Sequence, residues 1–251
     1  MFSNIIEFSI HPDLADNNII KPKPAKKFLP DWYKKVEPHD FPVRNIKGCI
    51  PFLDGITAGY TLPLPQDFHL NYNFFDKEKQ LPAIRYHYGY AMSASNEELH
   101  KYNLNSHTPQ EHNMNQLGGH GSFPVEKNGK IFSFLKILNP WLIKTPPGYS
   151  CLFIPPILNE NDYFHIIPAI VDTDKFKLWV NFPIIINADV YPKFEKIFTQ
   201  GTPYVQIIPF KRESWKSKFS TFENNKKDQF NYLSELVNIY KKQIWFKKKW
   251  D

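Results

Sequence analysis

Proline is the residue that most restricts the folds open to this chain. The sequence contains 22 prolines against 10 glycines, and many of the prolines stand at the ends of short apolar runs. Proline lacks a backbone N–H and fixes φ near about −65°, so it is disfavoured in helix interiors and central strands. The abundant Phe, Tyr and Ile residues favour strands in the intervals. We therefore expect a mainly β, β-rich α+β fold of short strands joined by proline-bearing loops.

Composition indicates a folded protein, which we expect to form one domain over residues 1–251. Hydrophobic residues make up 42% of the chain and charged residues 22%, which is typical of a globular protein. Cys49 and Cys151 are too few for a disulfide framework and lack a zinc-binding spacing. A reducing, cytoplasmic location fits these two thiols. No apolar run approaches the roughly 18 residues of a membrane span, so we expect no membrane partner.

The net charge of +6 is concentrated near the two ends, in Lys21–Lys27 and Lys241–Trp250. Clustered lysines of this kind are typical of solvated tails as well as of nucleic-acid contacts. No nucleic-acid recognition motif accompanies them. The sequence therefore predicts that nucleic acid is not a partner.

The first quarter of the chain divides into an arm and a strand-forming segment. Residues 1–46 form the arm, whose prolines at 22, 24 and 30 favour an extended start. Asp31 is expected to cap a short turn that holds Trp32 and Tyr33. Residues 47–67, which alternate apolar and small side chains between turn signals, predict one or two strands.

The remaining chain has three parts. Residues 68–130 are polar and weakly periodic and contain six of the nine histidines, which predicts an irregular insertion that is functional or mobile. Residues 131–210 hold short apolar runs that predict a β core. Within residues 211–251, apolar residues recur at spacings of three and four, which predicts an amphipathic helix from about Lys227 to Lys247, followed by a basic tail.

Three segments of the β core resemble motifs of dUTPase-like proteins, in the same order and at about the same spacing. They are "PPGYSCLFIPP" (146–156), "IIPAIVDTDKF" (166–176) and "GTPYVQIIPF" (201–210), and "TAGYTL" (57–62) is similar to the first motif of that family. The resemblance implies a β-clip, barrel-like core and frequent homo-oligomers, either trimers or dimers.

The chemistry of the family carries over poorly. Asp172 matches the aspartate that activates water, but Lys175 replaces the tyrosine expected three residues later. Pro156 and Ile157 stand where the family has its phosphate-facing arginine and serine, and Thr61 replaces the aspartate of the first motif. We therefore do not expect dUTP hydrolysis.

Other segments are similar to uncharacterised proteins of bacteria and large phages. These segments are "KGCIPFLDGITAGYTLPL", "NPWLIKTPPGYS" and "PFKRESW". The similarity implies a phage-related origin, for which the location would be the bacterial host cytoplasm. It names no activity.

Asp172 and Asp174 lie between two apolar runs, and both a structural and a ligand-binding interpretation are open. The structural one is a tight turn whose carboxylates accept backbone N–H bonds. In the second, the turn borders a pocket for a small polar or anionic ligand. The candidate ligand-binding residues are Asp172, Asp174, Lys175, Gln206, and Gly118 and Gly119, whose N–H groups suit a phosphate.

The histidine-rich insertion suggests a second kind of site. His107, Glu111, His112 and His120 are candidate ligands for a divalent metal such as iron, because two imidazoles and a carboxylate suit oxygen chemistry. The alternative is that they are ordinary loop residues.

Three functional hypotheses follow. The first is a ligand-binding β-clip-like protein of unknown activity. The second is a metal-dependent oxidase or oxygenase. The third is a phage assembly component whose ends, including Trp245, Phe246 and Trp250, tie subunits together. Trp215 is expected to pack in the core.

Overall fold

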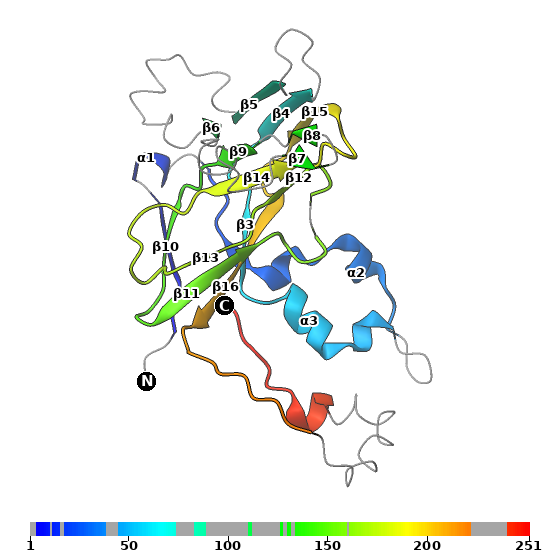
Figure 1. Ribbon diagram of the computed structural model, residues 1–251, viewed down its shortest axis with the longest axis vertical. Helices are drawn as coiled ribbons and strands as arrows, with labels where there is room; N and C mark the ends of the chain where they lie inside the picture. Colours follow the sequence, from blue (N-terminus) through cyan, green and yellow to red (C-terminus); the bar gives the residue numbers. More distant parts are fainter. Residues whose placement is uncertain are drawn as a thin grey trace.

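The protein is mainly β, as expected, and its sheets are antiparallel throughout (Figure 1). The computed structural model describes residues 4–10, 12–15, 18–38, 45–73, 83–88, 110–111, 126–127, 130–131, 134–159, 161–221 and 240–251. Among the helices in these ranges, none is long and apolar enough to cross a membrane.

The largest sheet has five strands. Its order is β13 (Ala169–Val171), β11 (Tyr149–Ile154), β16 (Pro203–Lys211), β3 (Tyr60–Pro63) and β2 (Lys23–Pro24). The central pair is β11 and β16, in register from Tyr149 opposite Lys211 to Ile154 opposite Gln206. The three dUTPase-like motifs therefore supply adjacent strands of one sheet, although this does not by itself establish a β-clip.

The other strands form two further sheets and two isolated pairs. The four-stranded sheet has the order β12 (Phe164–Ile166), β14 (Phe182–Ile186), β9 (Phe134–Ile137) and β6 (Gln110–Glu111). The three-stranded sheet has the order β15 (Lys193–Phe198), β4 (Phe68–Asn73) and β5 (Ala83–Tyr88). The pairs are β1 (Glu7–Ile10) with β10 (Trp141–Lys144), and β7 (Glu126–Lys127) with β8 (Lys130–Ile131).

Alternation along β4, β12 and β14 places their apolar side chains in one buried cluster, to which β11 and β16 also contribute. On β4, Phe68, Leu70 and Tyr72 are fully buried while the residues between them are partly exposed. The Phe68 ring lies 6.0 Å from Phe164 and 6.1 Å from Phe198, measured between ring centroids. Burying each side chain of this size contributes roughly 1.5–3 kcal/mol, so these strands are held mainly by their shared core.

The expected boundary of the insertion at Phe68 is therefore wrong. Residues 68–73 form β4, a core strand, and residues 83–88 form β5, its antiparallel neighbour. The cause is the period of "FHLNYN", in which each apolar side chain is followed by a polar one, as in a half-buried strand. Histidine and asparagine on its outward face made the segment look like a polar loop.

The segment expected to hold strands at residues 47–67 begins instead with helices. In this segment η2 (Ile46–Gly48) is followed by α3 (Ile50–Ile56). The arm before it holds α1 (Pro12–Ala15), η1 (Ala25–Phe28) and α2 (Asp31–Lys35). Figure 1 shows α2 and α3 beside the sheets. Pro51 lies in the first turn of α3, where a missing N–H removes no helical bond. The predicted strand is confirmed only at β3.

Asp31 does not cap the turn as expected. It is the first residue of α2, whose N-cap is Pro30, and its carboxylate pairs with Lys34 at 2.9 Å. Trp32 and Tyr33 lie in this helix, and their rings pack on Phe52 of α3.

Gly59 is required by the close approach of the chain to β16. It has φ of +67°, and a Cβ atom at this position would lie 1.9 Å from the carbonyl oxygen of Ile207. Only glycine fits both the backbone conformation and the space. The packing of β3 against β16 therefore depends on this residue.

A C-terminal helix was expected from about Lys227 to Lys247, and its predicted end at Lys247 is wrong. Residues 222–239 lie outside the described ranges. The described part is one π-helical turn, η6 (Tyr240–Ile244), closed by the Trp245 N–H donating to the Tyr240 carbonyl at 2.7 Å. No helix follows from Trp245 to Asp251, because this stretch turns back toward the domain. We call residues 240–251 the C-terminal tail.

Candidate functional site

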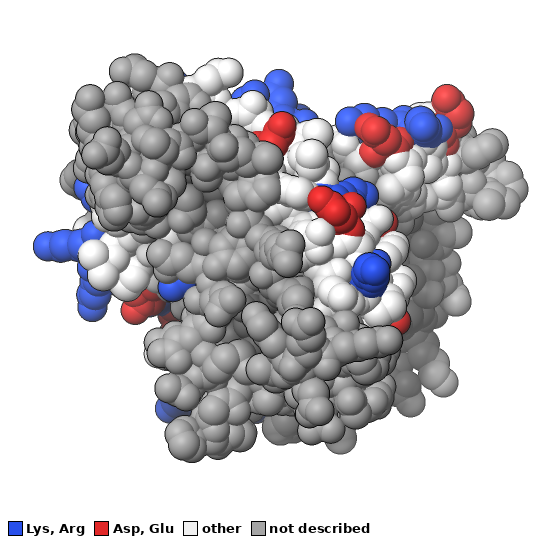
Figure 2. Space-filling view, turned by 90° about the horizontal axis from the view of Figure 1, so that it is seen from above, with Lys and Arg blue, Asp and Glu red and all other residues white. Residues whose placement is uncertain are grey.

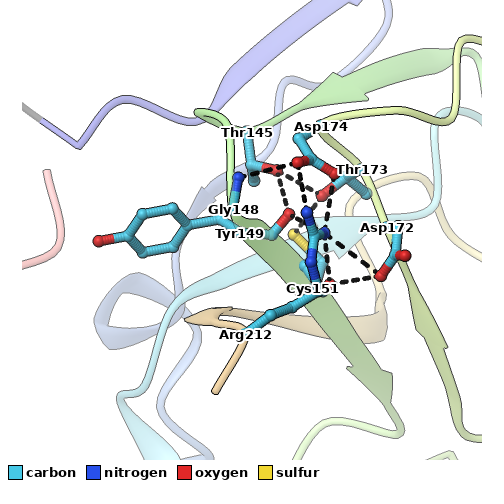
Figure 3. A network of polar contacts seen from close by, with 9 residues as sticks. Thr145, Gly148, Tyr149, Cys151, Asp172, Thr173, Asp174 and Arg212 are labelled. Carbon is cyan, nitrogen blue, oxygen red and sulfur yellow. Dashed lines mark hydrogen bonds and ion pairs between the residues drawn. The ribbon is translucent and has the colours of Figure 1, made fainter. Parts of the chain in front are cut away.

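Arg212 joins the ends of three neighbouring strands (Figure 3). It follows β16 directly, Tyr149 and Ser150 begin β11, and Asp172 and Asp174 lie in the turn after β13. Because β13, β11 and β16 are adjacent in one sheet, their ends bring these side chains together. We call this group of five residues the arginine clamp.

Asp174 receives two parallel hydrogen bonds from the guanidinium group of Arg212. Nη1 donates to Oδ1 at 2.8 Å and Nη2 to Oδ2 at 2.5 Å. Nη1 also donates to the Tyr149 carbonyl and to Ser150 Oγ, both at 3.0 Å. Asp172 completes the clamp, with Oδ1 at 3.3 Å from Arg212 Nη1 and accepting from Ser150 Oγ at 2.6 Å.

The clamp holds Asp174 in its ionised form. Its side chain is only 5% exposed, and the Gly148 N–H also donates to its carboxylate at 2.8 Å. The bonds from Arg212, and then the one from Gly148, hold the pKa of Asp174 well below its usual range. The same bonds to Asp174 raise the pKa of Arg212. A carboxylate held this way cannot take up a proton at neutral pH, so Asp174 serves structure rather than acid–base chemistry.

A second layer of hydroxyl groups lies beneath the clamp. The Thr145 and Thr173 hydroxyl oxygens are 2.7 Å apart, and Thr173 Oγ1 donates to Cys151 Sγ at 3.3 Å. Burial raises the pKa of the Cys151 thiol to about 11. Cys151 is therefore a neutral thiol of the core and not a nucleophile.

The turn expected at Asp172 and Asp174 is confirmed, but the expected use of their carboxylates is wrong in part. The N–H groups of Lys175 and Phe176 both donate to the Asp172 carbonyl, at 2.9 and 2.8 Å. Asp174 accepts a backbone N–H as expected, but from Gly148, which lies outside the turn, and the other partners of the two carboxylates are the side chains of Ser150 and Arg212. No sequence pattern indicated this pairing, because Arg212 is 38 residues beyond Asp174.

Gln206 and Lys175, two of the candidate ligand-binding residues, lie apart from each other. Gln206 is buried, and its amide group donates to the carbonyls of Gly55 and Ala58 while its oxygen accepts from the Ile157 N–H. These bonds tie β16 to the end of α3, and they leave no donor for a ligand. Lys175 is exposed on the turn.

The candidate phosphate loop and metal ligands lie almost wholly outside the described residues. Gly118, Gly119, His107, His112 and His120 belong to the undescribed ranges. For Glu111 the structure gives the backbone, which pairs with Leu135 of β9. Within the described ranges, no group of three or more His, Cys, Asp or Glu side chains is placed to hold a metal ion. The proposed iron site stays a prediction.

A cavity of about 220 Å³ adjoins the arginine clamp. Its wall includes Thr145 and Tyr149, which also belong to the clamp and its hydroxyl layer, and three aromatic side chains face it, from Tyr60, Tyr149 and Trp250. Lys249, Asn4 and Pro209 also contribute. Of these residues the sequence singled out only Trp250, because they come from five distant segments that the fold brings together.

The C-terminal tail forms one wall of this cavity and is fixed at both ends. Trp245 Nε1 and Lys248 Nζ donate to Oδ2 of Asp54, at 2.9 and 2.5 Å. The Trp250 ring packs edge-on against Tyr60 at 6.1 Å, and the Tyr60 hydroxyl donates to the Asp251 carbonyl at 3.1 Å. Burial, and then the charge of Asp251, raises the pKa of Tyr60, so this phenol stays protonated at neutral pH.

Both ends of the chain therefore contact their own domain where the structure describes them. At the other end, β1 pairs with β10 and β2 with β3. These contacts engage Lys23 and Pro24 of the arm and Trp245 and Trp250 of the tail within one chain, while Phe246 stays exposed. Subunit assembly stays a prediction. No protein-family model and no curated protein sequence matches this chain.

Proposed function

We propose that the protein binds a small, flat, anionic molecule in the cavity beneath the C-terminal tail. The observation that carries the proposal is the lining itself, which combines three aromatic residues with one lysine. A volume of about 220 Å³ is below the ~300–1,000 Å³ of sites for drug-sized ligands. The ligand is therefore the size of a single substituted ring.

The chemistry of the lining sets the class of ligand. Lys249 is the one side chain charged at neutral pH among the described residues around the cavity, and none of them carries a carboxylate. An anionic group is thus attracted by Lys249, and the charge of Asp251 that acts on Tyr60 comes from outside the lining. Faces of Tyr60, Tyr149 and Trp250 favour a planar partner, since aromatic groups stack with offset or edge-on geometry. Asn4 and Thr145 supply polar atoms that orient it.

Binding, rather than hydrolysis, is the activity that we propose for this core. In the resemblance to dUTPase-like proteins, Asp172 stands at the water-activating position, but here it is engaged by Ser150 and Arg212. Its Oδ1 is thus already occupied by contacts within the clamp. The resemblance thus supports a ligand-binding β-clip-like scaffold without its catalytic step.

Thermal unfolding with a panel of single-ring compounds tests the proposal. Benzoate and nicotinate are the flat anions, benzamide and uracil the flat neutral compounds, and cyclohexanecarboxylate the anion that is not flat. Binding to the native state raises the unfolding midpoint, by an amount worth about 2.7 kcal/mol at one hundred times Kd. We expect at least one flat anion to raise the midpoint and the other two classes to raise it less. Equal shifts in all classes, or none, would contradict the proposal.

Paired variants locate the site. Lys249→Ala and Trp250→Ala should abolish the shift, because both side chains line the cavity. Lys247→Ala and Phe246→Ala remove the same side-chain types from exposed positions of the tail and should leave the shift unchanged. A ligand whose effect survives both cavity variants binds elsewhere, which would reject the site.

A further inference from the structure

The chain leaves the sheets after β16 as an exposed segment that carries two bare aromatic rings. Residues 212–221 contain no helix or strand, and Figure 1 shows them running away from the end of β16. Trp215 is 86% exposed and Phe219 is 93% exposed, so the expectation that Trp215 packs in the core is wrong. Neither ring contacts another aromatic ring of the described chain. We call residues 211–221 the aromatic segment.

Lysines alternate with these rings. Lys216 and Lys218 lie between Trp215 and Phe219, and all four side chains are exposed. Unlike Arg212, which is engaged in the clamp, these two lysines form no ion pair within the described chain. The rings and the charges are thus free to contact a partner together.

The C-terminal tail repeats the same combination. Phe246 is 79% exposed, and Lys241, Lys242 and Lys247 are exposed as well. The aromatic segment and the tail together hold nine basic and two acidic residues, so their positive excess is larger than the net charge of +6 of the whole chain.

The two segments lie at one end of the molecule. Figure 1 shows both below the sheets, and their upper ends meet where Pro209, Lys249 and Trp250 line one cavity. Figure 2 shows the opposite end, where basic and acidic side chains of the described residues lie close together. Among the basic residues of the two segments, Lys211, Arg212 and Lys248 are ion-paired, so Lys216, Lys218, Lys241 and Lys242, which have no ion pair in the described chain, supply the positive charge beside the exposed rings.

We propose that the aromatic segment and the C-terminal tail form a binding surface for single-stranded nucleic acid. Lysines attract the phosphate backbone, and exposed rings stack on bases that are not paired. Such stacking is available to every base, so we expect little dependence on sequence. This surface adjoins the proposed ligand cavity, which Lys249 and Trp250 of the tail line, but Trp215 and Phe219 of the aromatic segment do not line it.

The same features argue against other partners. A duplex hides the faces of its bases, so the rings would have nothing to stack on. A membrane surface is bound by a continuous apolar helix face, whereas here Lys216, Ser217 and Lys218 separate two single rings. A second copy of this positively charged end would be repelled.

Fluorescence anisotropy of the full-length protein with labelled oligonucleotides tests the proposal. We expect dT20 and rU20 strands to bind, and a 20-base-pair duplex of mixed sequence to bind at least tenfold more weakly. Trp215→Ala with Phe219→Ala should weaken binding to dT20 by roughly fivefold or more, as expected for loss of base stacking. Circular dichroism checks that the double variant is folded, and since both side chains are exposed we expect no change.

A matched pair of charge variants tests the role of the lysines. Lys216→Ala with Lys218→Ala should reduce the slope of log Kobs against log salt concentration by about 1.4, which is two phosphates at about 0.7 each. Lys175→Ala with Lys177→Ala, an exposed pair of the same spacing on another loop, should leave the slope unchanged.

Three results would overturn the proposal. One is equal affinity for the single strand and the duplex, and another is unchanged affinity in the aromatic double variant, since either leaves only unspecific attraction of charges. The third is stronger binding to vesicles of 70% phosphatidylcholine and 30% phosphatidylserine than to dT20, which would assign the surface to membranes.

Discussion

Asp174 shows how one side chain fixes the end of a sheet. It is almost completely buried, yet charged, because Arg212 and the Gly148 N–H neutralise it from two sides. Buried charges are tolerated when they are paired and hydrogen-bonded in this way, and removing one partner is costly. Arg212 in turn contacts Tyr149, Ser150 and Asp172, so the loss of Asp174 would loosen all three strand ends.

We expect Asp174→Asn to lower the unfolding midpoint at pH 7. Because the pKa of Asp174 is depressed in the folded protein, its ionised form contributes stability above about pH 4, the pKa of an unfolded aspartate. That contribution is lost as the pH falls further, so the difference between the variant and the natural protein should shrink from pH 4 to pH 2. Urea unfolding across this range measures it. Asp162→Asn, at an exposed aspartate outside the clamp, should show no such dependence, and a constant difference for Asp174→Asn would contradict the assignment.

At this scale the sequence located the two aspartates but could not assign their partner. A turn is a local property, so "VDTDKF" predicted it correctly. The bond between Asp174 and Arg212 depends on which strands become neighbours, which the sequence does not state. The cavity depends on the same arrangement, because its lining joins residues as far apart as Asn4 and Trp250. Trp215 illustrates the reverse case, since hydrophobicity alone does not say that a side chain finds no core to enter.

The elements of the fold depend on periodicity and on a few positions that allow only one residue. The short strands of residues 131–210 were predictable because alternation is strong and prolines close each run. The helix α3 was not, since "IPFLDGI" is too short to display a helical period and contains two β-branched isoleucines. Strand β4 was missed because its polar face was taken for a loop.

Gly59 gives a prediction for the junction between α3 and β3. Gly59→Ala forces a Cβ atom toward the Ile207 carbonyl at a positive φ, so we expect it to destabilise the protein by roughly 2–5 kcal/mol. Gly55→Ala is the matched control, because it lies in α3 with open space around the new methyl group. Alanine favours a helix over glycine by about 0.5–1 kcal/mol, so this variant should be slightly stabilised. Urea denaturation compares the two, and similar effects would contradict the close approach.

At the scale of the whole molecule, both ends of the described chain pack against the domain between them. The arm adds β1 and β2 to the sheets, and the tail returns to Asp54 and Tyr60. The sequence indicated that the prolines at 22 and 24 would keep the arm extended, but whether it covers its own domain or a neighbour depends on the length and path of every intervening element.

We expect deletion of residues 245–251 to lower the free energy of unfolding by about 1–2 kcal/mol and to leave the number of subunits per particle unchanged. The loss comes from the ring contact between Trp250 and Tyr60 and from exposed ion pairs, each of which contributes modestly. Urea denaturation and light scattering measure the two quantities. Phe246→Ala, which removes a ring that is 79% exposed, should change stability by less than about 0.5 kcal/mol. A smaller number of subunits per particle after the deletion would instead show that the tail joins subunits.

The anchoring of the tail also determines when the cavity exists. Its walls include residues 4–6 and 249–250, so the cavity exists only when the two ends of the described chain come together, and closing a loop of that length is costly in entropy. Contacts of this kind open by local fluctuations while the sheets stay intact. A ligand would therefore enter during brief detachment of the tail, and its presence would slow hydrogen exchange at the Trp245 N–H while leaving exchange in β4 unchanged.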